Sequence, residues 1–75
     1  MRKLVGRNFA RLRRELGLTQ EEVAYRSGFS QQYLSGLENG ASNPAVVSLY
    51  ELAEALGIDY LEFFKTGHAS KKRSE

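Results

Sequence analysis

The sequence has 75 residues, which is enough for one small domain. It contains no cysteine and one histidine, His68, which excludes a disulfide framework and a zinc site built from cysteines or a histidine cluster. The net charge is only +2, but residues 1–14 carry +6, residues 15–64 carry −7 and residues 65–75 carry +3. Two basic ends around an acidic middle predict an anionic partner that is contacted from the ends.

The composition is that of a folded protein that stays outside the membrane. Hydrophobic residues make up 41% of the sequence and charged residues 27%, which is typical of a globular domain and not of a disordered chain. No apolar stretch approaches the ~20 residues that cross a membrane, and the N-terminus lacks the pattern of a secretory signal peptide. We therefore expect a soluble, cytoplasmic protein.

The N-terminal segment has the periodicity of an amphipathic helix. Its apolar residues recur at intervals of four, three and four positions, which places them on one helical face: Val5, Phe9, Leu12 and Leu16. Gly17 follows as a residue that can end a helix in the left-handed conformation. These features predict a helix over about residues 3–16.

The next segment begins with a complete helix-start pattern. Thr19 can act as the N-cap, and Glu22 stands three positions later, which is the spacing of a capping box. Gly28 follows as a residue that can adopt the left-handed conformation of a tight turn. The pattern predicts a short helix over about residues 20–27.

A further helix start comes directly after this turn. Ser30 can cap a helix, and Leu34 and Leu37 then have the spacing of an inward face. The asparagine–glycine pair at residues 39–40 is typical of a chain that leaves a helix. We predict a third helix over about residues 31–38.

Two more helices are predicted before the C-terminus. Asn43 and Pro44 are suited to the cap and the first position of a helix. The apolar residues that follow predict its inner face: Val46, Leu49, Leu52, Ala53 and Leu56. Asp59 and Glu62 form another capping-box pattern, which predicts a fifth helix over about residues 60–65.

The segment 20–39 is the most informative part of the sequence. Helices this short are not stable alone, but two of them joined by a tight turn form a helix-turn-helix when a third helix packs behind them. In that motif the first turn of the second helix reaches base edges in the major groove of DNA. Here that turn contains Gln31 and Gln32, and a glutamine amide can bond adenine at N6 and N7 together. The alternative is that these residues are ordinary exposed helix surface.

Three stretches resemble a known family in their order and spacing. They are LGLTQEEVA, SGFSQQYLSGLENG, and NP followed by LYELAEALGI. Over about residues 4–64 the chain resembles the phage repressor and Cro proteins, also called the XRE family. The resemblance implies an all-α fold, a compact five-helix lambda-repressor-like DNA-binding domain at residues 1–65, with its helix-turn-helix at residues 20–39. It also implies a transcriptional regulator that binds a palindromic operator in double-stranded DNA as a homodimer. The polar and basic residues 66–75 are expected to form a disordered tail.

The same resemblance implies roles for residues that match the family motif. Base readout is implied for the start and outer side of the third helix: Gln31, Gln32, Tyr33, Ser35 and Gly36. Family members often carry a long polar side chain at the position of Gly36, which glycine cannot supply. Contacts to the DNA backbone are implied for the helix starts and the following loop: Thr19, Gln20, Ser30, Asn39 and Asn43. An ion pair between Arg13 and Glu38 is implied as a link between the first and third helices.

The positive charge for phosphate contacts must come from outside the third helix and the loops that flank it. No lysine or arginine lies between Ser27 and Val47, and non-specific affinity grows with the number of phosphates that are neutralised. We therefore predict phosphate contacts from arginines of the first helix: Arg7, Arg11 and Arg14. The alternative is that these arginines are solvated surface charges. A modest dependence of binding on salt follows, together with a need for dimerisation.

The C-terminal helix carries more apolar surface than so short an element can bury within one chain. Exposed apolar patches of this kind mark interaction sites. We predict that three of these residues form a dimer interface: Tyr60, Leu61 and Phe64.

The inventory of reactive residues excludes an enzyme. There is no cysteine, one histidine in the tail, one aspartate that is needed as a cap, and no phosphate-cradling glycine loop. No catalytic residue, metal site or cofactor is predicted. The main alternative is a protein-interaction module on the same fold, an antitoxin or a subunit of a complex, with weak DNA binding. A contact between acidic residues such as Glu21 and RNA polymerase is a further hypothesis, as is association with the nucleoid.

Overall fold

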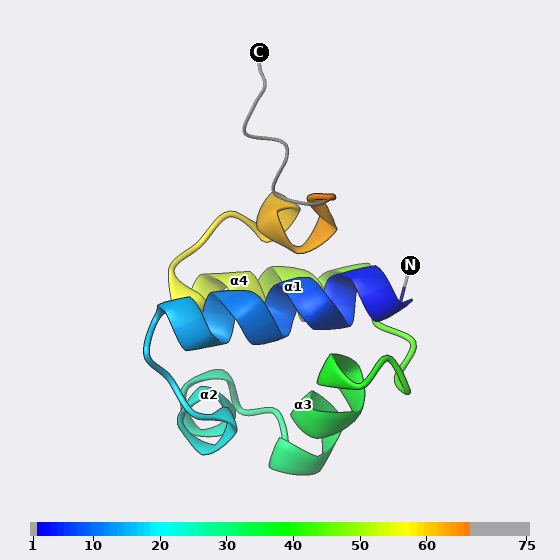
Figure 1. Cartoon of the computed structure of the whole chain (residues 1–75). Coiled ribbons are helices and arrows are strands. Elements are labelled where there is room, and N and C mark those ends of the chain that lie inside the picture. The colour runs from blue at the N-terminus through cyan, green and yellow to red at the C-terminus, as the bar shows by residue number, and fades with distance from the viewer. Residues whose placement is uncertain (1, 67–75) are drawn as a thin grey trace.

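The computed structural model describes residues 2–66, and all regular secondary structure in this range is helical (Figure 1). Four α-helices are followed by one 3₁₀ helix: α1 (Arg2–Glu15), α2 (Gln20–Ser27), α3 (Gln31–Glu38), α4 (Val46–Leu56) and η1 (Tyr60–Phe64). The expected all-α fold is confirmed. The expected tail lies outside the described residues, apart from its first residue.

The helices enclose one hydrophobic core. α1 packs against α3 and η1, α4 packs against α2 and η1, and α2 packs against α3. In Figure 1, α2 and α3 lie on one side of α1 and η1 lies on the other. Every element contributes buried side chains to the core: Val5, Phe9, Leu12, Val23, Leu34, Leu37, Leu49, Leu52, Ala53, Leu56 and Phe63. The helix-turn-helix pair is therefore held from behind by α1 and α4.

The C-terminal ends of α1 and α4 have the same backbone geometry. Gly17 has a φ of 74°, and the amide of Leu18 donates to the carbonyl of Arg13. This is the Schellman ending, in which a left-handed residue allows the chain to reverse. Gly57 ends α4 with the same φ and the same bond pattern, from Ile58 to Ala53. The predicted stop at Gly17 is confirmed, but Leu16 is more exposed than the predicted inner face requires, because the helix ends at Glu15.

The predicted start of α4 is wrong. The helix begins at Val46 with Ala45 as its N-cap, and no side chain caps it. Asn43 and Pro44 belong instead to the preceding loop. Val46 is 65% exposed, so it is not part of the inner face. The physical reason is that the asparagine–proline pattern sets only a local preference, whereas the bonds of the loop to α3 fix where the chain can turn.

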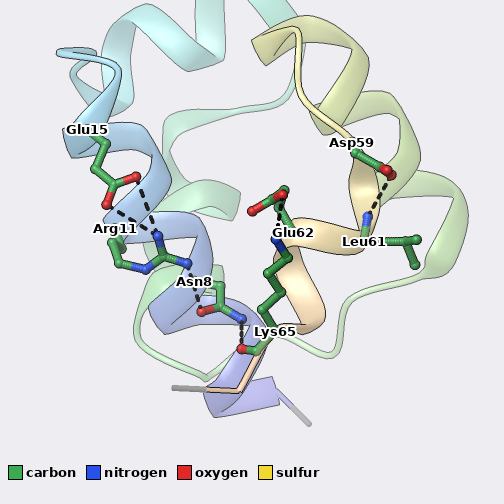
Figure 2. Close-up of polar contacts among 7 residues, drawn as sticks. All are labelled: Asn8, Arg11, Glu15, Asp59, Leu61, Glu62 and Lys65. Atoms are coloured by element: carbon green, nitrogen blue, oxygen red, sulfur yellow. Dashed lines mark hydrogen bonds and ion pairs between the residues drawn. The ribbon is translucent and has the colours of Figure 1, made fainter. Parts of the chain in front are cut away.

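The predicted fifth α-helix is a five-residue 3₁₀ helix, so the described residues contain four α-helices. Asp59 caps it as expected, because its Oδ1 accepts from the amide of Leu61 at 3.1 Å. The reciprocal half of the predicted capping box is absent. Glu62 instead pairs with Lys65, with 2.9 Å between Oε2 and Nζ (Figure 2). The amide of Glu62 donates to the carbonyl of Asp59 at 3.0 Å, which is the i to i+3 bond of a 3₁₀ turn.

A close approach of two backbones joins α1 to α3. Gly6 is buried, and a Cβ atom placed on it would overlap the carbonyl oxygen of Leu37. Because glycine has no side chain, α1 can lie directly against the last turn of α3. The periodicity of the apolar residues gave no sign of this contact.

Asn8 fastens the C-terminal element to α1. Its side chain is buried, and its Nδ2 donates to the carbonyls of Phe63 at 2.7 Å and Lys65 at 2.8 Å. Figure 2 shows the amide of Asn8 between Lys65 on one side and Arg11 on the other. The bonds satisfy carbonyls at the end of η1 that no further helical turn could satisfy.

Replacement of Asn8 by alanine is expected to lower the free energy of unfolding by about 2 kcal/mol. Two buried or partly buried carbonyls would lose their donor, and each loss costs about 1 kcal/mol or more. Urea unfolding followed by circular dichroism measures the change. Asn43→Ala, at an exposed asparagine, is the matched control and should change stability by less than about 0.5 kcal/mol. Equal stability of the two variants would contradict the role of Asn8.

Candidate nucleic-acid interface

The start of α2 has the predicted capping box. The hydroxyl of Thr19 accepts from the amide of Glu22 at 3.0 Å, and the carboxylate of Glu22 accepts from the amide of Thr19 at 2.8 Å. The backbone hydrogen bond from Thr19, followed by the side-chain bond, lowers the pKa of Glu22 below its ordinary value of 4.5. Gln20 stands half-buried in the first turn that this box fixes.

The lowered pKa of Glu22 predicts a pH dependence of stability. Because the folded pKa lies below the ordinary value of 4.5, the stabilisation is complete above that pH and is lost as the pH falls through the folded pKa. Glu22→Gln keeps an acceptor but does not titrate, so its thermal midpoint should fall less steeply in acid than that of the wild type. Glu21→Gln, at the neighbouring carboxylate, is the matched control. If the thermal midpoints of Glu22→Gln and the wild type fell by the same amount between pH 7 and about pH 3, this prediction would be contradicted.

The turn between α2 and α3 is fixed by short polar contacts. Gly28 has a φ of 85°, and its amide donates to the carbonyl of Ala24 at 2.9 Å. The hydroxyl of Ser27 donates to the carbonyl of Val23 at 2.7 Å and accepts from the amide of Phe29 at 3.2 Å. These bonds within the turn fix the angle between the two helices.

The start of α3 presents two exposed amide side chains. Ser30 caps the helix, because its hydroxyl accepts from the amide of Tyr33 at 3.0 Å. Gln31 and Gln32 are exposed, and Leu34 on the opposite side of the helix is completely buried. The two glutamines thus project from a helix start whose orientation is fixed by the core and by the cap.

Tyr33 is placed differently from the two glutamines. Its ring is half-buried and stacks on Phe29, with 5.2 Å between ring centroids and 25° between planes. Packing of this ring holds the turn against the first turn of α3. Of the predicted contact residues in this turn, only Tyr33 also packs against the core.

The outer side of α3 continues with Ser35 and Gly36, both half-buried. The carbonyl of Ser35 accepts from the amide of Asn39 at 3.1 Å, which ends the helix. Gly36 lies beneath the side chain of Ser42 from the loop that follows. Asn39 and Asn43 are exposed in that loop.

The three predicted arginines of α1 lie together. They line a hollow between α1 and the end of α3, with these neighbours: Leu4, Asn8, Ala10, Glu38 and Asn39. Arg7 and Arg14 are exposed. Arg11 is held by Glu15, with 3.3 Å between Nη1 and Oε2, and it also bonds the Oδ1 of Asn8 at 3.4 Å (Figure 2). The positive charge of the hollow is therefore partly compensated at Arg11.

The expected ion pair between Arg13 and Glu38 is present. Arg13 Nε donates to Oε2 of Glu38 at 2.6 Å and Nη2 donates to Oε1 at 3.2 Å, while Nη1 donates to the carbonyl of Leu18 at 2.8 Å. The side chains are only 14% and 11% exposed. Such a bidentate, largely buried pair fixes geometry, and here one guanidinium binds both the end of α3 and the α1–α2 loop.

Other kinds of site are not found in the part of the chain that the structure describes. Within residues 2–66 no helix is long and apolar enough to cross a membrane. The same residues hold no group of three histidine, cysteine, aspartate or glutamate side chains that could bind a metal ion.

Comparison with known proteins gives a consistent picture. Residues 9–63 match the family model described as Helix-turn-helix, HTH_3. An uncharacterised HTH-type transcriptional regulator from Sinorhizobium fredii is 74% identical over 62 residues, which cover 83% of this chain and 80% of that protein. The immunity repressor of Bacillus phage phi105 is 37% identical over 54 residues, covering 72% of this chain and 38% of the repressor. The crystal structure of the restriction-modification controller protein C.AhdI from Aeromonas hydrophila superposes with a TM-score of 0.79 at 37% identity, covering 83% of this chain and 94% of the controller.

Proposed function

The chain belongs to the helix-turn-helix family of DNA-binding transcriptional regulators, and we propose that it binds operator DNA sequence-specifically as a homodimer. Its relatives are regulators and not enzymes. In the proposed complex α3 lies in the major groove, and its first turn contacts base edges. A protein with this role would act in the cytoplasm, at the nucleoid.

One observation carries the proposal. Gln31 and Gln32 are exposed on a helix start that is fixed from three directions, by the cap of Ser30, by the turn at Gly28 and by the buried Leu34. Bidentate readout of adenine requires a side chain with both a donor and an acceptor, held in a rigid orientation. This arrangement supports direct readout of adenine by the two amides.

Contacts to the DNA backbone are proposed around the first turn of α3. Amides and polar side chains at helix starts and in the loop after α3 would orient the protein on the duplex without reading its sequence: Thr19, Gln20, Ser30, Asn39 and Asn43. Arg7 and Arg14 would add charge from the hollow beside α3. Arg11 would contribute only by leaving Glu15. We therefore expect few phosphates to be neutralised, and a shallow dependence of affinity on salt.

Selection of bound fragments from a random DNA pool tests the proposal. A homodimer with two-fold symmetry should select a palindromic site with half-sites about 34 Å apart, one helical turn of DNA. A titration of the selected duplex at increasing salt then gives the number of phosphates. Selection of no common sequence, or of a site without symmetry, would contradict the proposed mode of binding.

An apolar patch on α4 and η1 supports the homodimer. Tyr60 lies edge-to-face with Tyr50 at 5.9 Å and with Phe64 at 6.2 Å between ring centroids. Leu61 is 54% exposed, and Figure 2 shows its side chain directed away from the network around Asn8. We propose that Tyr60, Leu61 and Phe64 pack against the same residues of a second copy.

Replacement of Leu61 by glutamate is expected to weaken the dimer at least tenfold. A charge would have to be buried in an apolar interface, while the folded monomer would keep it in solvent. Sedimentation equilibrium measures the monomer–dimer constant. Leu16→Glu, at an exposed leucine outside η1, is the matched control. An unchanged constant in Leu61→Glu would remove this residue from the interface.

The second candidate function is a protein-interaction module with weak DNA binding. The exposed face of α2 favours it, because Tyr25 is 90% exposed beside Glu21, Glu22 and Arg26 around a shallow hollow. An acidic and aromatic face of this kind fits a basic surface of a protein partner. For a regulator that is bound to DNA, the proposed partner is RNA polymerase. Glu21→Gln tests the contact with RNA polymerase. It should leave operator affinity unchanged and should lower transcription from a promoter that the protein activates.

A further inference from the structure

Gly36 and Ser42 meet on the outer side of α3. A Cβ atom on Gly36 would lie 2.7 Å from the Oγ of Ser42, closer than two such atoms approach. The hydroxyl of Ser42 therefore occupies the space into which a side chain at residue 36 would extend. The backbone holds it there, because the carbonyl of Gly36 accepts from the amides of Ala41 at 2.8 Å and Ser42 at 3.2 Å.

The side chain of Ser42 is turned toward the helix. Ala41 and Asn43, its neighbours in the loop, are exposed, whereas Ser42 between them is half-buried. Residue 36 also stands four positions after Gln32, which places both on one side of an α-helix, about 6 Å apart along its axis. The loop thus supplies the next polar group in the row that Gln32 begins.

We propose that Ser42 is a specificity-determining residue, which reads a base edge from the place that a side chain at residue 36 would take. The inference rests on the proposed function, because it requires α3 to lie in the major groove. A serine hydroxyl both donates and accepts a hydrogen bond, so it can bond a purine or a pyrimidine edge there. Gly36 is the positioning residue, since its missing side chain leaves the room that Ser42 fills.

Two substitutions test this arrangement from opposite sides. Ser42→Ala removes the hydroxyl and leaves the backbone bonds to Gly36 in place. Gly36→Ala keeps the hydroxyl but adds the Cβ atom that must displace it. Alanine has the higher helix propensity, so Gly36→Ala should melt no lower than the wild type. Both variants can therefore be compared with wild type as folded proteins.

The readout is the base preference of each variant in selection from a random DNA pool. Ser42→Ala and Gly36→Ala should each lose about three- to tenfold discrimination at the same base pair of each half-site, with the other positions unchanged. The double variant should lose no more than either single variant, because both changes remove the same bond. Gln32→Ala should lose discrimination at a different position.

Three results would overturn the proposal. Unchanged preferences in Ser42→Ala would show that the hydroxyl reads no base. A uniform loss of affinity over all sequences would make Ser42 a phosphate contact instead. Failure of the wild type to select any sequence would overturn the proposed function and this inference together, whereas loss of preference in Gln32→Ala alone would overturn only the role of Ser42.

Discussion

Replacement of Gly6 by alanine is expected to lower the free energy of unfolding by about 3 kcal/mol or more. The added Cβ atom would overlap the carbonyl oxygen of Leu37, and a backbone atom cannot rotate away as a side chain can. A domain of this length has a net stability of about 4–11 kcal/mol, so the change removes a large part of it. Urea unfolding followed by far-ultraviolet circular dichroism measures the effect.

Gly36→Ala is the matched control for this prediction. It also adds one methyl group to a helical glycine, but the atom that it meets is the hydroxyl of Ser42, which can rotate. Helix propensity alone predicts that both variants gain stability. We expect Gly36→Ala to keep or gain stability and Gly6→Ala to lose it, so their free energies of unfolding should differ by about 3 kcal/mol or more. If Gly6→Ala unfolded within about 1 kcal/mol of the wild type, the close approach of α1 and α3 would not be a constraint on the fold.

The double variant Gln31→Ala/Gln32→Ala is expected to lose specific DNA binding by roughly 30-fold or more. Each bidentate contact of an amide with adenine provides about 1–3 kcal/mol of discrimination, and both would be removed. Because the two side chains are exposed and make no core contact, the fold should be retained. Affinity for a scrambled duplex should change little, since that affinity comes from phosphate contacts.

The measurement is the ratio of affinities for the selected and the scrambled duplex at one salt concentration. Gln20→Ala is the informative control, because a lost phosphate contact should weaken both duplexes equally and leave the ratio unchanged. If the double variant kept the wild-type ratio, α3 would not be the reading helix, and the second candidate function would gain support.

Local patterns predicted the helix starts and stops that depend on neighbouring residues. Thr19 with Glu22, Ser30, Gly17 and Gly28 all act as the sequence suggested, because each bond joins residues within one turn. The spacing of Leu34 and Leu37 predicted which side of α3 is buried, and so which side exposes Gln31 and Gln32. The family resemblance added the link between Arg13 and Glu38, which local patterns alone could not supply.

Contacts between distant residues were outside the reach of these patterns. Asn43 looked like a cap, but the bonds of the loop to Gly36 delay the helix to Val46. Glu62 had the right spacing for a capping box, yet Lys65 offers it a charged partner. In the candidate site, the sequence predicted Arg11 as a phosphate contact without showing that Glu15 already holds it. The errors at Asn43 and Glu62 arose where a local preference of about 1 kcal/mol met a competing bond. The phosphate contact of Arg11 stays a prediction.

The amide of Asn8 joins parts of the chain that are 55 and 57 positions apart. These two bonds hold η1 against α1, so η1 and the first half of α1 stabilise each other. We expect amides of η1 to exchange with solvent only through global opening, at rates close to those of the core, although η1 stands near the end of the chain. Folding would then be a single cooperative event that is completed when the two ends meet.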